Sequence, residues 1–125
     1  MATETNPGIS FQSRGATTVK TSHFTGAFAE VLAQVAAGPC LILGMSVTNT
    51  GAATVYLQIY DAASAPADAS VPVIPPVKIL AGDSYARTFP LAIATGVVLV
   101  GSSTAATKTV IGASDLFAEV HTTQV

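Results

Sequence analysis

Hydrophobic and polar residues alternate along much of this chain, and a period of two predicts β-strands. The clearest such segment is residues 41–48, where every second side chain is apolar. The face expected to lie in the core consists of Leu41, Leu43, Met45 and Val47. The intervening positions then point away from the core.

Residues 54–61 repeat the alternation, with Val55, Leu57 and Ile59 expected inside. The opposite face carries Tyr56, Gln58 and Tyr60. The connection at residues 49–53 contains Asn and Gly, which tolerate the positive φ of tight turns. The two segments are therefore predicted to pair as an antiparallel hairpin.

Further short strands are predicted where β-branched and aromatic residues cluster between turn residues. These segments are residues 17–25, 77–80, 84–89, 97–103 and 115–122. In the last segment Leu116, Ala118 and Val120 should face inward, which leaves Glu119 and His121 on the outer, solvated face.

Residues 26–37 fit two patterns, because their apolar positions match one face of a helix as well as one face of a strand. The segment is short, ends at Gly38-Pro39 and leads directly into the next predicted strand. We therefore predict a strand here, with a helix as the alternative.

Residues 62–76 (AASAPADASVPVIPP) contain four prolines, which donate no backbone hydrogen bond and exclude a central strand. A long, proline-stiffened connection of this kind is expected to carry the chain from one sheet to the other. With no long helical stretch between the strands, the prediction is an all-β fold: a single antiparallel β-sandwich, jelly-roll-like, of about eight short strands.

The chain has 125 residues, enough for one domain with its own core. Residues 1–14 are polar and interrupted by Pro7-Gly8, so they are expected to form an N-terminal arm or flexible tail. Residues 15–125 are assigned to the sandwich. The start of the chain lacks the basic and apolar regions of a secretory signal, and no apolar stretch reaches the length of about 20 residues that a membrane helix needs.

Charged residues make up only 10% of the chain, against about 25% in ordinary globular domains. Much of the surface must therefore be neutral, which favours a subunit of an assembly. The net charge is -2, and the five basic residues are spread singly along the chain. Because no basic stripe exists to neutralise phosphates, nucleic acid is not an expected partner.

Motifs for catalysis or cofactors are missing from the sequence. The two histidines, His23 and His121, stand in no nucleophile or zinc motif, and no glycine-rich phosphate-binding loop is present. Cys40 cannot form an internal disulfide and is expected to be a small buried hydrophobe. We therefore predict no enzyme, no cofactor and no metal. A convergence of Asp61, Asp83, His23 or His121 in the fold would reopen the question of an enzyme.

Two weaker binding hypotheses follow from loop and strand residues. Asp61, Asp68 and Asp83 are candidates for a calcium site at one rim of the sandwich, although loops often hold Asp for turn chemistry. Sandwiches that bind carbohydrate stack sugars on exposed aromatic rings. The available rings belong to Tyr56, Tyr60 and Tyr85.

Residues 47–66 (VTNTGAATVYLQIYDAASAP), followed by PVIPP at 72–76 and ILAGDS at 79–84, resemble small virion proteins of tailed bacteriophages with a jelly-roll or similar β-sandwich. The resemblance continues to the Ser-Ser-Thr of residues 102–104 and covers about residues 41–122. It is a pattern of hairpin, tyrosine-rich strand, proline-rich crossing and turn, without an invariant signature.

The resemblance implies a structural virion protein, most plausibly a cement or decoration protein that stabilises the phage head. The partners would then be the major capsid protein and further copies of this chain, as a dimer or trimer, and no catalytic residues carry over. The alternative is a carbohydrate-binding or connector module of a phage tail or fibre. Partner contacts are predicted in the arm and in the crossing segment, at Asn6, Pro7, Ile9, Phe11, Arg14, Pro66, Val71, Pro72, Ile74 and Pro75.

Overall fold

A computed structural model describes residues 21–37, 39–68, 70–88 and 90–124, with the backbone alone described at residues 21, 22 and 32–37. Within these ranges the chain is all β, as predicted, and contains nine strands. They are β1 (Thr21–Phe28), β2 (Glu30–Ala37), β3 (Cys40–Asn49), β4 (Val55–Asp61), β5 (Val77–Ile79), β6 (Ser84–Arg87), β7 (Leu91–Ile93), β8 (Gly96–Ser102) and β9 (Leu116–Gln124).

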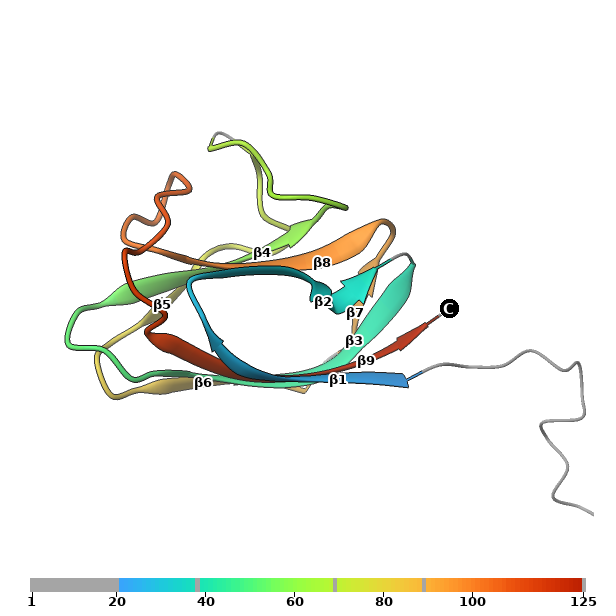
Figure 1. Ribbon diagram of the computed structural model, residues 1–125, viewed down its shortest axis with the longest axis horizontal. Coiled ribbons are helices and arrows are strands. Elements are labelled where there is room, and N and C mark those ends of the chain that lie inside the picture. Colours follow the sequence, from blue (N-terminus) through green and yellow to red (C-terminus); the bar gives the residue numbers. More distant parts are fainter. Residues whose placement is uncertain (1–20, 38, 69, 89, 125) are drawn as a thin grey trace, which may run out of the picture.

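The strands form two antiparallel sheets that pack face to face (Figure 1). One sheet has the order β1-β9-β3-β6, with β7 also paired to β3, and the other has the order β2-β8-β4-β5. Since β6 and β7 pair with different parts of β3, they act as one interrupted strand. In each sheet a strand from the end of the chain, β9 or β8, then lies between two strands from its first half. This is the connectivity of a jelly roll, so the predicted fold class is confirmed.

The core lies between the two sheets, where both inner faces are apolar. Val55, Leu57 and Ile59 of β4 point into it, as their alternation predicted, and so do Leu116, Ala118 and Val120 of β9. The remaining buried members are Phe28, Val31, Cys40, Ile42, Met45, Val47, Ile79, Ile93, Val97 and Leu99.

The inward face of β3 differs from the prediction in its first half. Ile42 is fully buried and Leu43 is 42% exposed, the reverse of the expected phase. The pairing with β9 shifts between Ile42 and Gly44, so that Leu43 and Gly44 together face His121. This β-bulge inserts one extra residue and changes which side chains face the core, while Met45 and Val47 beyond it point inward as expected.

The predicted hairpin between residues 41–48 and 54–61 is wrong. β3 pairs with β6, β7 and β9, whereas β4 pairs with β5 and β8 in the other sheet. The connection between them is an arch that crosses from one sheet to the other. The arch begins at Asn49, the last residue of β3, which is fully buried. Its side-chain Nδ2 donates hydrogen bonds to the carbonyls of Ala53 (2.7 Å) and Ile79 (3.0 Å).

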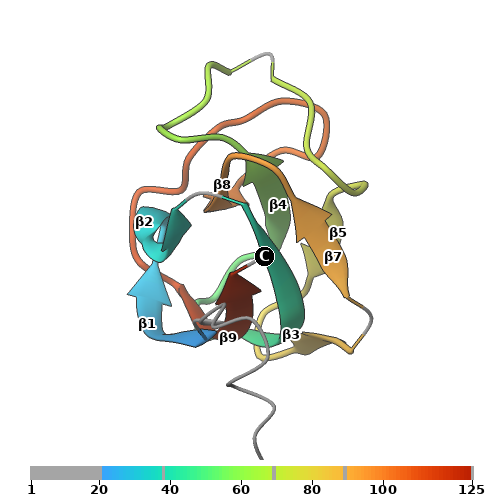
Figure 2. The same ribbon diagram turned by 90° about the vertical axis from the view of Figure 1, so that its right-hand side faces the viewer.

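Residues 26–37 lie in β1 and β2, apart from a bend at Ala29, which excludes the helical alternative. The sequence pattern did not predict β7, which lies in the connection expected between the predicted strands at residues 84–89 and 97–103. Residues 62–76 are not a regular strand, as predicted, but they join β4 to β5 of the same sheet rather than crossing between sheets. We keep the name crossing segment for residues 62–76, although the segment does not cross between the sheets. It lies over the outer side of the four-stranded sheet, beside the loop of residues 103–115 (Figures 1 and 2).

Candidate functional site

The outer face of the four-stranded sheet is covered by the crossing segment and the 103–115 loop instead of facing solvent. Tyr60, Val98 and Val100 form a second small apolar cluster there, and the sequence prediction that Tyr60 is exposed is wrong: it is 2% exposed. All seven residues of β8 are buried, because this strand has the main core on one side and the covering loops on the other. This burial could not be predicted from the sequence, since alternation identifies an outer face but not what covers it.

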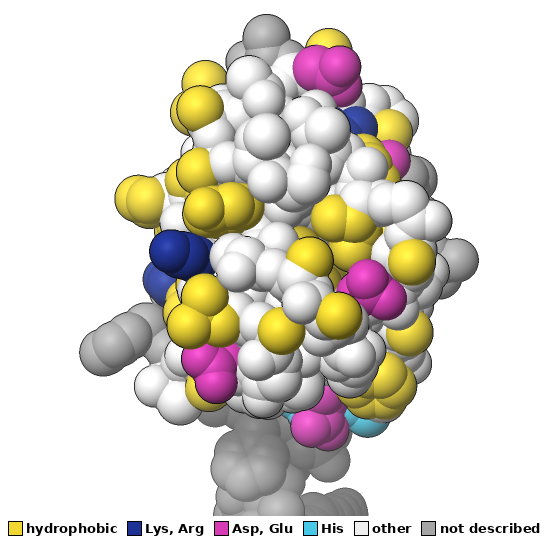
Figure 3. All heavy atoms as spheres, turned by 90° about the vertical axis from the view of Figure 1, so that its left-hand side faces the viewer, with side chains coloured by type: hydrophobic (Ala, Val, Ile, Leu, Met, Phe, Trp, Pro, Cys, Tyr) yellow, Lys and Arg dark blue, Asp and Glu magenta, His cyan; other side chains and the backbone are white. Residues whose placement is uncertain are grey.

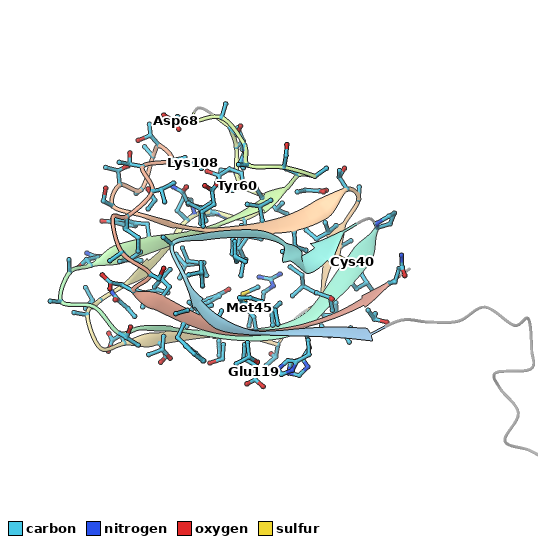
Figure 4. The ribbon with its side chains drawn as sticks, in the orientation of Figure 1. Cys40, Met45, Tyr60, Asp68, Lys108 and Glu119 are labelled. Atoms are coloured by element: carbon cyan, nitrogen blue, oxygen red, sulfur yellow. The ribbon has the colours of Figure 1, made fainter. Side chains whose placement is uncertain are left out.

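Lys108 anchors the two covering segments to the sheet (Figure 4). Its ammonium lies 2.7 Å from Glu30 Oε2 at the start of β2 and donates to the Pro66 carbonyl at 2.7 Å. The contact with Glu30 is an ion pair without good hydrogen-bond alignment, and Oε2 has no other partner. The Lys108 backbone N–H also donates to the Asp68 carbonyl. One 7%-exposed lysine therefore joins the edge strand β2, the crossing segment and the 103–115 loop.

Gln58 and Ser102 hold the 103–115 loop in place from the sheet below it. The Gln58 amide approaches the carbonyls of Thr104 (3.3 Å) and Thr107 (3.1 Å), and its oxygen accepts the Tyr60 hydroxyl at 2.8 Å. Ser102 Oγ donates to the same region of the loop and accepts from the Thr109 N–H. Burial, followed by the charges of Glu30 and Asp68, raises the pKa of Tyr60 above its usual range.

Lys108 holds the crossing segment at Pro66 and Asp68, and five of the predicted partner-contact residues lie in this segment. Val71 is 86% exposed and Pro75 is exposed, so both are accessible to a partner. Pro72 is half-buried, and Ile74 packs partly against the main core. Pro66 is half-buried with its carbonyl bound to Lys108. The other predicted contacts, Asn6, Pro7, Ile9, Phe11 and Arg14, and the predicted arm of residues 1–14, lie outside the described residues.

The crossing segment itself has one charged residue, Asp68, among apolar and small residues. Figure 3 shows the end of the sandwich where the arch and the β5–β6 turn lie, with separate apolar, acidic and basic side chains scattered among neutral ones. Over all the described residues, the large apolar side chains with substantial exposure are Val71, Val73, Leu80 and Val110, together with Leu43 and Phe117 of the five-stranded sheet. Val71 is the most exposed of them. Tyr56 and Tyr85 are only half-buried, and Tyr85 packs partly against the core.

The structure brings the two histidines together on the opposite face of the molecule, the outer side of the five-stranded sheet. His23 of β1 and His121 of β9 are directly opposite in register, and their rings stack with centroids 4.4 Å apart. Glu119 Oε2 lies 3.2 Å from His23 Nε2 and 3.4 Å from His121 Nε2. The sequence placed Glu119 and His121 on one outer face but could not pair β9 with β1, so it missed this cluster.

The aspartates proposed for calcium do not converge. Asp61 ends β4 and accepts bonds from the N–H groups of Ala94, Thr95 and Gly96, whereas Asp83 lies beyond the other end of that strand, with its carbonyl bound to the Asn49 N–H. Burial acts to raise the pKa of Asp61, but the three backbone hydrogen bonds outweigh it and lower the pKa. Cys40 is a buried free thiol, as predicted, and burial together with the charge of Asp61 raises its pKa.

In comparisons with known proteins, no family model, no curated protein and no solved structure matched this chain. Among the residues that the structure describes, no helix is long and apolar enough to cross a membrane.

Proposed function

We propose that this chain is a non-catalytic structural protein that decorates a bacteriophage head by binding the major capsid protein through its crossing segment. The observation that carries the proposal is Val71. This side chain is 86% exposed on a segment that the Lys108 anchor fixes to the sheet. An exposed apolar side chain on a fixed loop suits recognition, since little conformational entropy is lost when a partner covers it.

The neutral surface supports the same function. With 10% charged residues, contacts to a shell would be mainly apolar and backbone-mediated and thus weakly dependent on salt. The resemblance of residues 41–122 to phage virion proteins supplies the identity of the partner and the location in the virion. A dimer or trimer placed at symmetric positions of the shell would add weak contacts into strong attachment.

The first test is the copy number of this chain in purified virions from its source, measured by quantitative mass spectrometry against the major coat protein. A decoration protein is expected on the order of hundreds of copies per particle, because it occupies repeated sites over the shell. About a dozen copies or fewer would instead favour a connector or tail module. Absence from the particle would overturn the virion assignment and leave carbohydrate binding, tested on a glycan array, as the alternative.

The second test addresses the contact surface itself. Val71→Asp should weaken binding to isolated heads by about tenfold or more, because an aspartate would have to lose its water in the interface. Leu43→Asp, at a 42%-exposed leucine of β3 in the five-stranded sheet, far from the crossing segment, is the control and should bind like the wild type. Equal binding by all three proteins would exclude Val71 from the contact, whatever the copy number.

A further inference from the structure

We propose that His23, Glu119 and His121 form a binding site for a divalent transition-metal ion, with Zn²⁺ as the best-fitting ion. This site is independent of the proposed function, since it lies on the other outer face of the sandwich. Figure 4 shows Glu119 pointing away from the five-stranded sheet, on the side opposite to Lys108 and Tyr60.

The spacing of the donor atoms matches the coordination of zinc. Zinc binds imidazole nitrogen and carboxylate oxygen at about 2.0–2.2 Å, so two ligands of a tetrahedral site are separated by about 3.3–3.6 Å. The two nitrogen-to-oxygen distances in the cluster are 3.2 and 3.4 Å, close to this separation. All three donor atoms lie within 4.8 Å of one another, and they form the only such group among the described residues.

The strand pairing supplies this geometry and makes it rigid. His23 and His121 are direct cross-strand neighbours in the β1–β9 ladder, and Glu119 lies two residues before His121 on the same face. The three side chains therefore lie side by side without a loop rearrangement. To bind one ion, the two stacked imidazole rings must turn about their side-chain bonds so that both Nε2 atoms point at it. Each is about half exposed (50%, 52% and 53% for His23, Glu119 and His121), so an ion can enter from solvent, and water can take the fourth position.

The donor set selects a class of ion. Two imidazoles and one carboxylate suit zinc, copper or nickel, whereas calcium and magnesium prefer oxygen ligands alone. In the ion-free molecule, the Nε2 atoms face the Glu119 carboxylate, and the Thr25 hydroxyl is also 2.8 Å from His23 Nε2. The ion would take the place of the Thr25 contact at His23 Nε2, and it needs both Nε2 atoms free of protons.

A bound ion would also join the edge strand β1 to β9, because it takes ligands from both strands. Ligands that bind only the folded state stabilise it. Zinc should therefore raise the melting temperature as well as bind.

The test uses the full chain without a histidine tag, dialysed against Zn²⁺ alone, with bound metal measured by elemental analysis and melting followed by circular dichroism. We expect one Zn²⁺ per chain and a higher melting temperature with zinc. His23→Ala, His121→Ala and Glu119→Gln should each weaken binding by at least about tenfold and remove the thermal shift.

Ser46→Ala is the matched control, because Ser46 lies opposite Glu119 on the neighbouring strand β3 and is exposed on the same face. It should bind zinc like the wild type. Circular dichroism without metal checks that each variant is folded. Failure of the wild type to retain zinc, or equal retention by the three ligand variants, would overturn the proposal.

Discussion

Lys108 forms an ion pair with Glu30 at 2.7 Å, between a loop that follows β8 and the first residue of β2. The lysine is 7% exposed and the glutamate 22% exposed, so water screens the pair only weakly. The same ammonium binds the Pro66 carbonyl. This pair therefore determines how the crossing segment, and with it the proposed contact surface, lies on the sheet.

Lys108→Ala should lower the free energy of unfolding by about 2 kcal/mol, because it leaves the partly buried Glu30 carboxylate, with its buried Oε2 atom, without a counter-charge. Urea unfolding measures this loss. Lys78→Ala is the matched control, since Lys78 is exposed on β5, and a change within about 0.5 kcal/mol is expected there. Equal losses in the two variants would contradict the role of Lys108 as an anchor.

Asn49→Ala should also destabilise the fold, by about 2 kcal/mol, since it leaves the buried carbonyl of Ile79 and the partly buried carbonyl of Ala53 without this donor. Asn49→Asp should be at least as harmful, because a carboxylate oxygen would then face both carbonyls. Thermal and urea unfolding of the two variants measure these effects. A wild-type-like Asn49→Asp protein would show that the donated hydrogen bonds matter little.

Asn49 lies where the prediction from the sequence failed, because it was expected at the turn of a hairpin and instead begins an arch between the sheets. Alternation identified the inner faces of β4 and β9 because those strands are regular, so each second residue meets the core. It failed at β3, where the bulge at Leu43 and Gly44 changes the phase. Nearness in sequence suggested a hairpin, yet Asn49 begins an arch, because which strands pair depends on contacts between residues far apart in the chain.

The candidate sites were predictable only in part for the same reason. The proline-rich composition of the crossing segment correctly indicated that it is not a regular strand. The exposure of Val71 came from the structure alone. The burial of Tyr60 beneath the loops and the meeting of His23 with His121 both require the complete topology. Neither leaves a local signal in the sequence.

The thiol of Cys40 should be unreactive in the folded protein. It is 3% exposed and its pKa is raised by burial and by the charge of Asp61, so little thiolate is present or accessible. A chromogenic disulfide reagent at mildly alkaline pH should therefore label the native chain slowly and the urea-unfolded chain rapidly, with one thiol per chain. Fast labelling of the native protein would indicate that the β3–β7 edge opens readily.

Asp61 should make stability depend on pH in the acid range. Its pKa in the folded protein lies below the ordinary value of 3.8, because the carboxylate accepts three backbone hydrogen bonds from residues 94–96. The stabilisation is therefore fully present above the ordinary value, where the carboxylate is charged in both states, and is lost as the pH falls through the lowered folded-state pKa.

Asp61→Asn should lower the free energy of unfolding by about 1 kcal/mol at neutral pH, since the bonds are charge-assisted but partly solvated. The difference from the wild type should shrink as the pH falls below about 3.8, because the wild-type carboxylate then becomes neutral as well. Urea unfolding of both proteins between about pH 7 and pH 3 measures this convergence. Asp83→Asn, at an exposed turn, is the control and should change stability little at neutral pH. A constant difference between wild type and Asp61→Asn at every pH would assign the effect to shape rather than to the charge of Asp61.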